Sequence, residues 1–310
     1  MSIKNYNIVC VSDEGYAQHA AVMLCSLFET NKQKHFRIYF LTTTLSDLTK
    51  QRLNLLCSKY NSTISFHYLS TDELSDLPVG QWNTIMYFKL FMPYVIPQSE
   101  DRCLFLDVDM IINADINELY NTDLHGKAFA AAEDIPDCII HKQRLGLSPK
   151  DVYINSGVMV CDLIEWRKRY SSDDIFTFTR KISDIIMNEQ DVLALYFKNS
   201  IEILPIKWNM VTFYFEREPR IFEKYKSELK EARLNPGILH FACPIKPWYK
   251  DCQHPYKYLY KEYLILTEWK DYKFPIFENM TPWGRTKRII RNLLNSIGFI
   301  KDKGFKQIRY

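Results

Sequence analysis

Residues 103–109 read Cys103-Leu104-Phe105-Leu106-Asp107-Val108-Asp109, an unbroken apolar run that leads directly into two aspartates. Four consecutive apolar residues are typical of a strand that is covered on both faces. In an extended chain, side chains two positions apart lie on the same face, so the spacing predicts that Asp107 and Asp109 point into one crevice. Open α/β sheets bind their ligands at the carboxyl ends of strands, where these aspartates would lie.

The hundred residues before this run alternate between strand and helix patterns. Strands are predicted over Asn7–Val11, Phe36–Leu41 and Ile64–Leu69. Helices are predicted over Tyr16–Thr30, from the cap residue Ser46 to about Tyr60, and over Thr84–Met92 with a stop at Pro93. This β-α-β-α-β order favours an α/β domain of the nucleotide-binding type, with parallel strands joined by crossover helices.

Further elements are expected after residue 110. The predicted strands are Ala128–Glu133, Tyr153–Cys161, Ile201–Pro205 and Gly237–Phe241, and the predicted helices are Leu163–Tyr170, Asp174–Met187 and Asp191–Lys198. The simplest division of the chain is one folded domain over residues 1–275 and a tail over residues 276–310.

Composition excludes several classes of protein. The chain has 310 residues, of which 47% are hydrophobic and 25% charged, so it is not disordered, collagen-like or a coiled coil. No apolar run reaches the roughly 18 residues of a membrane-spanning helix, and the first residues lack the apolar core of a secretory signal. We therefore expect a cytoplasmic protein, with its eight scattered cysteines reduced and mostly buried.

The chemistry of the two aspartates favours a cation. Adjacent carboxylates repel each other unless a cation lies between them, and oxygen ligands suit Mg²⁺ or Mn²⁺. His240 follows a short apolar run and is a candidate third ligand, while Lys246, in a loop stiffened by prolines, is a candidate phosphate partner. The alternatives are a solvated turn at the aspartates, a histidine at the edge of the core and a surface lysine.

Three other polar segments are candidate ligand contacts. Asn155-Ser156-Gly157 offers groups that hydrogen-bond sugar hydroxyls and a residue that permits close approach, or it is an ordinary turn. Asn188-Glu189-Gln190-Asp191 lies at a helix start, where simple capping is the alternative. In Val11-Ser12-Asp13-Glu14-Gly15-Tyr16, Asp13 is suited to a base or ribose and Tyr16 to stacking. The chain has no glycine-rich phosphate loop.

In this order and spacing, the segments resemble glycosyltransferase family 8, most of all the bacterial lipopolysaccharide α-galactosyltransferases and glucosyltransferases. The resemblance rests on Val11–Tyr16, Phe105–Asp109, Asn155–Val158, Asn188–Asp191 and His240–Trp248, and it covers about residues 6–275. It implies a GT-A catalytic domain, in which a Rossmann-like mixed sheet is flanked by helices. It further implies retaining, metal-dependent transfer of galactose or glucose from a UDP-hexose to a lipid-linked or cell-surface glycan, with no nucleic acid partner.

The resemblance also implies roles for individual residues. Asp107, Asp109 and His240 would hold Mn²⁺ or Mg²⁺, and Asn155, Glu189 and Gln190 would line the sugar and acceptor pocket. The nucleotide-sugar contacts would include Val11, Ser12, Asp13, Tyr16, Lys89, Val108, Cys243 and Lys246, with Val11, Asp13 and Tyr16 at the uridine and Lys246 at a phosphate.

Three positions depart from the family pattern. Lys89 stands where the family usually has arginine, Glu189 where it has aspartate, and Cys243 where it has glycine, and these changes leave the identity of the donor open. The neutral carbonyl oxygen of Gln190 is a poor nucleophile. The hypothesis is therefore a front-face, ion-pair-like substitution rather than a covalent glycosyl-enzyme.

The tail has a character of its own. The net charge of +3 conceals eight basic residues and one acidic residue from position 285 to the end. A helix that begins near Pro282 would place its isoleucines and leucines on one face and its arginines mostly on the other; the apolar positions are Ile289, Ile290, Leu293, Leu294 and Ile297. Such a helix is predicted to bind an anionic membrane surface at the inner face of the plasma membrane. Docking of its apolar face on the domain is the alternative.

Other functions remain open at this point. An aspartate-nucleophile phosphohydrolase also uses Asp-x-Asp after a strand, but it places the motif after the first strand rather than at residue 107. A non-catalytic protein that binds a UDP-sugar and a membrane while retaining the fold is a second alternative. A transferase that acts on a protein-linked glycan is a third.

Overall fold

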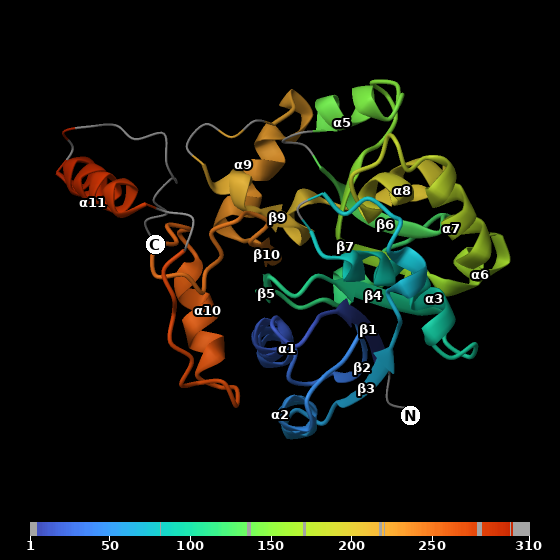
Figure 1. Ribbon diagram of the computed structural model, residues 1–310, viewed down its shortest axis with the longest axis horizontal. Coiled ribbons are helices and arrows are strands. Elements are labelled where there is room, and N and C mark those ends of the chain that lie inside the picture. Colours follow the sequence, from blue (N-terminus) through green and yellow to red (C-terminus); the bar gives the residue numbers. More distant parts are fainter. Residues whose placement is uncertain are drawn as a thin grey trace.

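The computed structural model describes residues 5–80, 82–134, 138–169, 172–216, 219, 221–277, 281–297 and 299. It contains a seven-stranded and a three-stranded sheet with helices packed around them (Figure 1). Within the described residues, no helix is both long enough and apolar enough to span a bilayer.

The strands of the described residues form the two sheets. They are β1 (Asn5–Val11), β2 (His35–Thr42), β3 (Thr63–Tyr68), β4 (Arg102–Leu106), β5 (Met110–Ile112), β6 (Phe129–Glu133), β7 (Ile154–Asp162), β8 (Ile201–Ile203), β9 (Met210–Val211) and β10 (Ile238–His240).

The α-helices range from one turn to four. They are α1 (Ala17–Thr30), α2 (Asp47–Lys59), α3 (Met92–Val95), α4 (Asn117–Tyr120), α5 (Cys138–Arg144), α6 (Leu163–Arg169), α7 (Ser172–Lys181), α8 (Glu189–Tyr196), α9 (Lys226–Leu234), α10 (Lys257–Leu264) and α11 (Pro282–Ser296). Short 3₁₀ helices are η1 (Asp72–Leu74), η2 (Thr84–Phe91), η3 (Ile206–Trp208), η4 (Thr212–Phe215) and η5 (Glu223–Tyr225).

The larger sheet is mixed, in the order β3-β2-β1-β4-β7-β6-β8. Its β3-β2-β1-β4 half is parallel, as the alternating pattern predicted, whereas β7 runs antiparallel to both β4 and β6. β1 lies between β2 and β4, so the connections leave it in opposite directions. The strand order reverses here, and such a point opens a crevice beyond the carboxyl ends of the strands.

The apolar runs of the central strands are buried on both faces, as expected for a sheet covered by helices. In β4, Leu104 packs with helices α1 and α2, while Phe105 packs on the opposite face with α6, α7 and α8 (Figure 1). A third cluster joins the small sheet β5-β10-β9 to α9 and α10. Of the eight cysteines, all of them free thiols, seven are buried.

Capping residues that the sequence indicated lie at the starts of two helices. Ser46 caps α2, since its side chain accepts a hydrogen bond from the Thr49 N–H. Asn188 caps α8 in the same way, by accepting from the Asp191 N–H. Both caps satisfy backbone donors that the first helical turn leaves free.

Other predictions were wrong in detail. The segment over Thr84–Phe91 is a 3₁₀ helix, and the chain does not stop at Pro93 but continues into α3. Proline is tolerated there because the first turn of a helix does not use its N–H. The helix predicted over Asp174–Met187 ends at Lys181, and the strand predicted to reach Pro205 ends at Ile203.

The predicted amphipathic helix of the tail is present as α11, at the periphery of the molecule and away from both sheets (Figure 1). Its first residue is Pro282, as the sequence indicated. Of its flanking basic segment, residues 301–310 lie outside the described part of the chain.

Candidate active site

Strand order brings the predicted site residues to one crevice. β1 and β4 are parallel neighbours, with Val9 opposite Phe105, so the residues that follow them emerge side by side. β7 runs the other way beside β4, and its Gly157 carbonyl accepts a hydrogen bond from the Asp107 N–H at 2.9 Å. Asn155, Ser156 and Gly157 therefore lie within strand β7 rather than in a turn before it.

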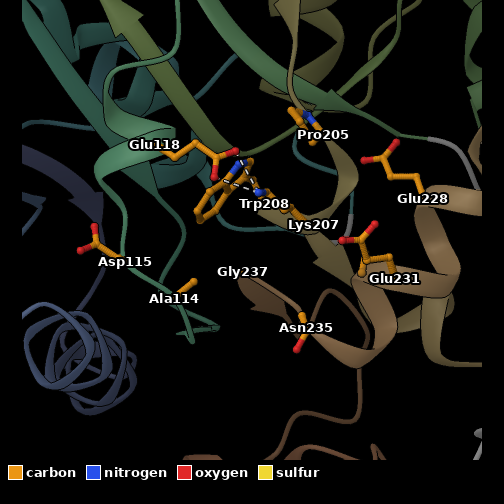
Figure 2. Close-up of a pocket in the computed structure, with 11 residues that line it drawn as sticks. Ala114, Asp115, Glu118, Pro205, Lys207, Trp208, Glu228, Glu231, Asn235 and Gly237 are labelled. Atoms are coloured by element: carbon orange, nitrogen blue, oxygen red, sulfur yellow. Dashed lines mark hydrogen bonds and ion pairs between the residues drawn. The ribbon is translucent and has the colours of Figure 1, made fainter.

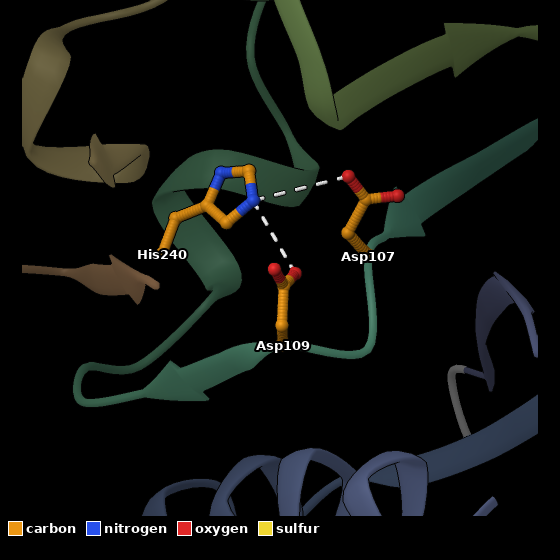
Figure 3. A group of neighbouring side chains, drawn as sticks. All are labelled: Asp107, Asp109 and His240. Atoms are coloured by element: carbon orange, nitrogen blue, oxygen red, sulfur yellow. Dashed lines mark ion pairs between the residues drawn. The ribbon is translucent and has the colours of Figure 1, made fainter. Parts of the chain in front are cut away.

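Asp107, Asp109 and His240 come together beyond the end of β4 (Figure 3). One ligand atom from each lies within 4.8 Å of the others. His240 Nε2 is 3.3 Å from Asp109 Oδ1 and 3.9 Å from Asp107 Oδ2. The two aspartates converge because the chain turns between β4 and β5, and not because an extended strand presents them on one face.

His240 is the last residue of β10 and pairs with Met110 of β5. The side of His240 that faces Gly157 is tightly packed, since a Cβ on Gly157 would lie 2.6 Å from His240 Cε1 and 2.9 Å from Asp107 Oδ2. Only glycine therefore fits beside the cluster. Two carboxylates and an imidazole are a donor set that suits Mn²⁺, and the residues present fit such an ion.

Lys246 neutralises part of the negative charge. Its Nζ lies 2.5 Å from Asp109 Oδ2 and donates to the Phe241 carbonyl at 2.8 Å. Burial alone would raise the pKa of Asp109, but the ammonium group of Lys246 beside it holds that pKa well below its usual value. Asp109 is thus ionised across the physiological range.

A second lysine, which is buried, lies on the other side of the aspartates. Lys89 of η2 is 3% exposed, and its Nζ lies 2.7 Å from Glu189 Oε1, 3.2 Å from Ser156 Oγ and 3.4 Å from Asp107 Oδ1. Burial alone would lower the pKa of Lys89, but the charges of Asp107 and Glu189 outweigh burial and raise it. Its ammonium group has three donors, and three side-chain oxygens surround it.

Gln190 is held at both ends of its amide. Its Oε1 accepts the Ser156 N–H at 3.0 Å, and its Nε2 donates to Asp134 Oδ2 at 2.9 Å. Ser156 Oγ also donates to Glu189 Oε1 at 3.0 Å. Ser156 therefore joins the two residues that begin α8 to strand β7.

The segment after β1 lies at the opposite rim. Asp13 Oδ1 accepts the Tyr16 N–H at 2.9 Å, and Ser12 is buried. The ring of Tyr16 is 41% exposed and meets Trp248 edge to face at 5.7 Å, while Trp248 stacks on His19 at 3.5 Å. This packing ties the loop that carries Lys246 to the start of α1.

The remaining predicted contacts differ in exposure. Val108 is 9% exposed and packs in the core, so its side chain faces away from the crevice. Cys243 is only partly buried, and its Sγ donates to the Ile245 carbonyl at 3.2 Å. Val11 ends β1 and is likewise partly buried.

Two residues of this region, Asn209 and Asp134, carried no sequence signal of their own, and the partners of a third, Asp191, were not predictable from its segment. Asn209 is 1% exposed and accepts from His240 Nδ1 at 2.8 Å, and Asp134 accepts from Gln190. Asp191 is fully buried by Arg144 and Tyr153, at 2.9 and 2.8 Å. Buried polar pairs of this kind have no periodicity or spacing that a sequence reveals.

A separate pocket of about 570 Å³ lies between η3, α9 and the start of β10 (Figure 2). Its charged lining comprises Asp115, Glu118, Glu228, Glu231 and Lys207, of which Lys207 is paired with Glu118 at 2.9 Å. Four carboxylates against one ammonium repel a diphosphate, so this pocket does not suit a nucleotide.

Comparisons with known proteins agree with this arrangement. The chain matches the family model described as "Glycosyl transferase family 8" over residues 7–252. It is 27% identical over 274 residues to General stress protein A of Bacillus subtilis (strain 168), covering 85% of this chain and 94% of that protein.

A second relative is a "Lipopolysaccharide 1,2-glucosyltransferase" of Escherichia coli (strain K12), 27% identical over 271 residues, with 86% of this chain and 79% of that protein covered. Among solved structures, the galactosyltransferase LgtC in complex with donor and acceptor sugar analogs superposes with a TM-score of 0.74 at 21% identity. That match covers 84% of this chain and 96% of LgtC, so the two share the GT-A fold.

Proposed function

Because the chain belongs to glycosyltransferase family 8 and is therefore a retaining hexosyltransferase, we propose that it moves galactose or glucose from a UDP-sugar to a glycan. The acceptor in this proposal is a lipid-linked or cell-surface glycan of the lipopolysaccharide type, as the name of the E. coli relative suggests. The transfer depends on a divalent cation, Mn²⁺ or in its place Mg²⁺.

The observation that carries the proposal is the convergence of Asp107, Asp109 and His240 between the buried Lys89 and the partly buried Lys246. The three ligands would hold the cation, which supplies positive charge to the diphosphate leaving group. A diphosphate at the cation would approach Lys246 from the side of Asp109. Tyr16 and Asp13 would contact uridine in this proposal; Asp13 accepts the Tyr16 N–H, and the Tyr16 ring packs on Trp248.

The other side of the aspartates suits the hexose. Cleavage of the anomeric bond leaves negative charge on UDP and positive charge on the sugar ring. Glu189, Gln190 and Asn155 offer oxygens and amide groups there, and Lys89 holds Glu189 in place through the 2.7 Å ion pair. We propose that Lys89 acts in this way, as a partner of the sugar pocket, because its three neighbours are side-chain oxygens.

The state of Gln190 favours front-face substitution. Its carbonyl oxygen already accepts the Ser156 N–H, which reduces its capacity to attack the anomeric carbon. Mass spectrometry of the enzyme after incubation with a fluorinated donor sugar tests this directly. We expect no covalent adduct, and a sugar attached to Gln190 or Glu189 would contradict the front-face route.

We also propose that α11 attaches the enzyme to the inner face of the plasma membrane. Its exposed apolar side chains include Trp283, Ile289 and Leu293, and with Ile297 just after the helix they are 61–73% exposed. Basic residues at about 1 kcal/mol each near an anionic surface add to this apolar contact. Removal of residues 285–310 should abolish sedimentation with phosphatidylglycerol vesicles. Unchanged sedimentation would refute the attachment.

The experiment that tests the function measures UDP release from a panel of UDP-sugars, with and without Mn²⁺. The wild-type enzyme is compared with Asp109→Ala and with the exposed control Asp123→Ala. We expect slow, Mn²⁺-dependent hydrolysis of one UDP-hexose by wild type and Asp123→Ala, and none by Asp109→Ala. Release that is independent of Mn²⁺ or retained in Asp109→Ala would overturn the assignment of the metal site.

A further inference from the structure

A chain of hydrogen bonds connects the backbone of β7 to His240. Gly157 N–H donates to Asn155 Oδ1 at 3.1 Å, and Asn209 Nδ2 donates to the same oxygen at 2.8 Å. Asn209 Oδ1 then faces His240 Nδ1 at 2.8 Å. Asn209 and His240 are 1% and 4% exposed, so water does not replace these bonds.

The backbone end of the chain determines the orientation of every group in it. A backbone N–H can only donate, so the Asn155 atom that faces Gly157 is its carbonyl oxygen. Because that oxygen is an acceptor, Asn209 must turn its NH₂ group towards Asn155 and its own oxygen towards His240. His240 Nδ1 therefore carries a proton, and in the neutral ring its Nε2 presents a lone pair.

This lone pair points into an acidic neighbourhood. Nε2 lies 3.3 Å from Asp109 Oδ1 and 3.9 Å from Asp107 Oδ2, and both carboxylates offer only lone pairs when ionised. In this tautomer of the neutral ring, Nε2 is a ligand for a cation and not a donor to Asp109. A histidine whose other nitrogen bonds an oxygen is the usual arrangement of a metal ligand.

The same bonds leave one group of Asn155 for a ligand. Its oxygen is occupied twice, whereas its NH₂ group has no hydrogen-bond partner among the residues that the structure describes. Asn155 thus meets a ligand as a donor. One residue, Asn209, links this donor to the lone pair of His240.

We propose that Asn209 is a positioning residue that holds His240 in the Nδ1–H tautomer and keeps the Asn155 amide turned as a donor. The cation in this inference rests on the proposed function, whereas the tautomer does not. Loss of Asn209 releases Nδ1, and His240 then places its proton on Nε2 and donates to Asp109. His240 Nε2, which should bind the cation, is then occupied by the hydrogen bond to Asp109.

Two measurements test the proposal. The first is ¹⁵N NMR of the metal-free enzyme, with the ring signals assigned through His240→Gln. We expect a protonated Nδ1 in wild type and a shift to protonated Nε2 in Asn209→Ala. The second is Mn²⁺ binding by calorimetry in the presence of UDP, where Asn209→Ala should bind about 10- to 100-fold more weakly.

Asn209→Asp separates the two roles of Asn209, which are to accept from His240 and to donate to Asn155. The aspartate side chain is nearly the same size as asparagine. Its carboxylate still accepts from Nδ1–H, so Mn²⁺ affinity should recover to near the wild-type value. It cannot donate to Asn155, so the KM for the donor sugar should be higher than that of the wild type. Asn31→Ala is the matched control, because Asn31 is also buried, donates to Leu27 O at 3.0 Å and lies outside the site.

The control should lose thermal stability without a change in tautomer or in Mn²⁺ affinity. The proposal is wrong if Asn209→Ala keeps the Nδ1–H tautomer or the wild-type Mn²⁺ affinity. A wild-type enzyme that binds no Mn²⁺ with UDP would instead refute the proposed metal site. The NMR experiment would still decide the role of Asn209.

Discussion

The buried ion pair between Lys89 and Glu189 makes the sharpest prediction for stability. The two side chains are 3% and 6% exposed, and Nζ and Oε1 are 2.7 Å apart. Glu189→Gln keeps the size of the side chain and removes its charge, which leaves a buried ammonium group with less compensation. Removal of one partner of a buried pair costs about 3–5 kcal/mol.

The structure places the expected loss at the lower end of that range. Lys89 keeps Asp107 Oδ1 at 3.4 Å and Ser156 Oγ at 3.2 Å, so its charge is not left wholly unpaired. We therefore expect a loss of about 3 kcal/mol in the free energy of unfolding. For a chain of 310 residues that corresponds to a fall of roughly 5 °C in Tm.

The assay is thermal unfolding followed by circular dichroism, with Glu202→Gln as the matched control. Glu202 pairs with Lys127 at the same 2.7 Å, but these side chains are 26% and 36% exposed, so the loss should stay below about 1 kcal/mol. The double variant Lys89→Met/Glu189→Gln should be more stable than Glu189→Gln alone, because no buried charge remains unpaired. If Glu189→Gln costs no more than Glu202→Gln, the reasoning fails.

Two further predictions follow from the packing of the site and of the small sheet. Gly157→Ala places a Cβ 2.6 Å from His240 Cε1 and 2.9 Å from Asp107 Oδ2. We therefore expect at least a tenfold loss of Mn²⁺-dependent UDP release, which is about the effect of displacing a metal ligand's partner. The control is Gly15→Ala, whose Cβ makes an ordinary 3.4 Å contact. Burial lowers the pKa of His254 to about 3. Below about pH 6.5 the unfolded chain therefore binds one more proton than the folded one. The free energy of unfolding should fall by about 2 kcal/mol from this residue as the pH drops from 6.5 to 5. His254→Asn keeps an acceptor for the Tyr256 N–H and should flatten that part of the curve, measured by denaturation at each pH, whereas an unchanged slope would show that His254 is not responsible.

Much of the fold was predictable from short-range patterns. The apolar run of β4, the alternation before it and the caps at Ser46 and Asn188 are set by contacts between neighbouring residues. Helices α9 and α10 were missed, although the lysines and glutamates of Lys226–Leu234 are typical helix formers. The extent of α7 was overestimated, because an apolar pattern continues past Lys181 where the chain turns.

For the site, the identity of candidate residues was predictable and their partners were not. Asp107, Asp109, His240 and Lys246 stood out by type and spacing, and the structure brings all four together. The two aspartates converge for a different reason than expected, because they lie in a turn and not in an extended strand.

The sequence by itself thus determined the α/β class, the polar groups that meet the crevice and the amphipathic tail, since each depends on residues close together in the chain. Only the tertiary structure decided that Lys89 pairs with Glu189, a hundred residues away, and that Asn209 orients His240. Such pairs form where packing excludes water, and a buried polar group then requires whichever partner the fold places beside it. No local pattern encodes that choice, because it is made by the strands and helices that bring the two side chains together.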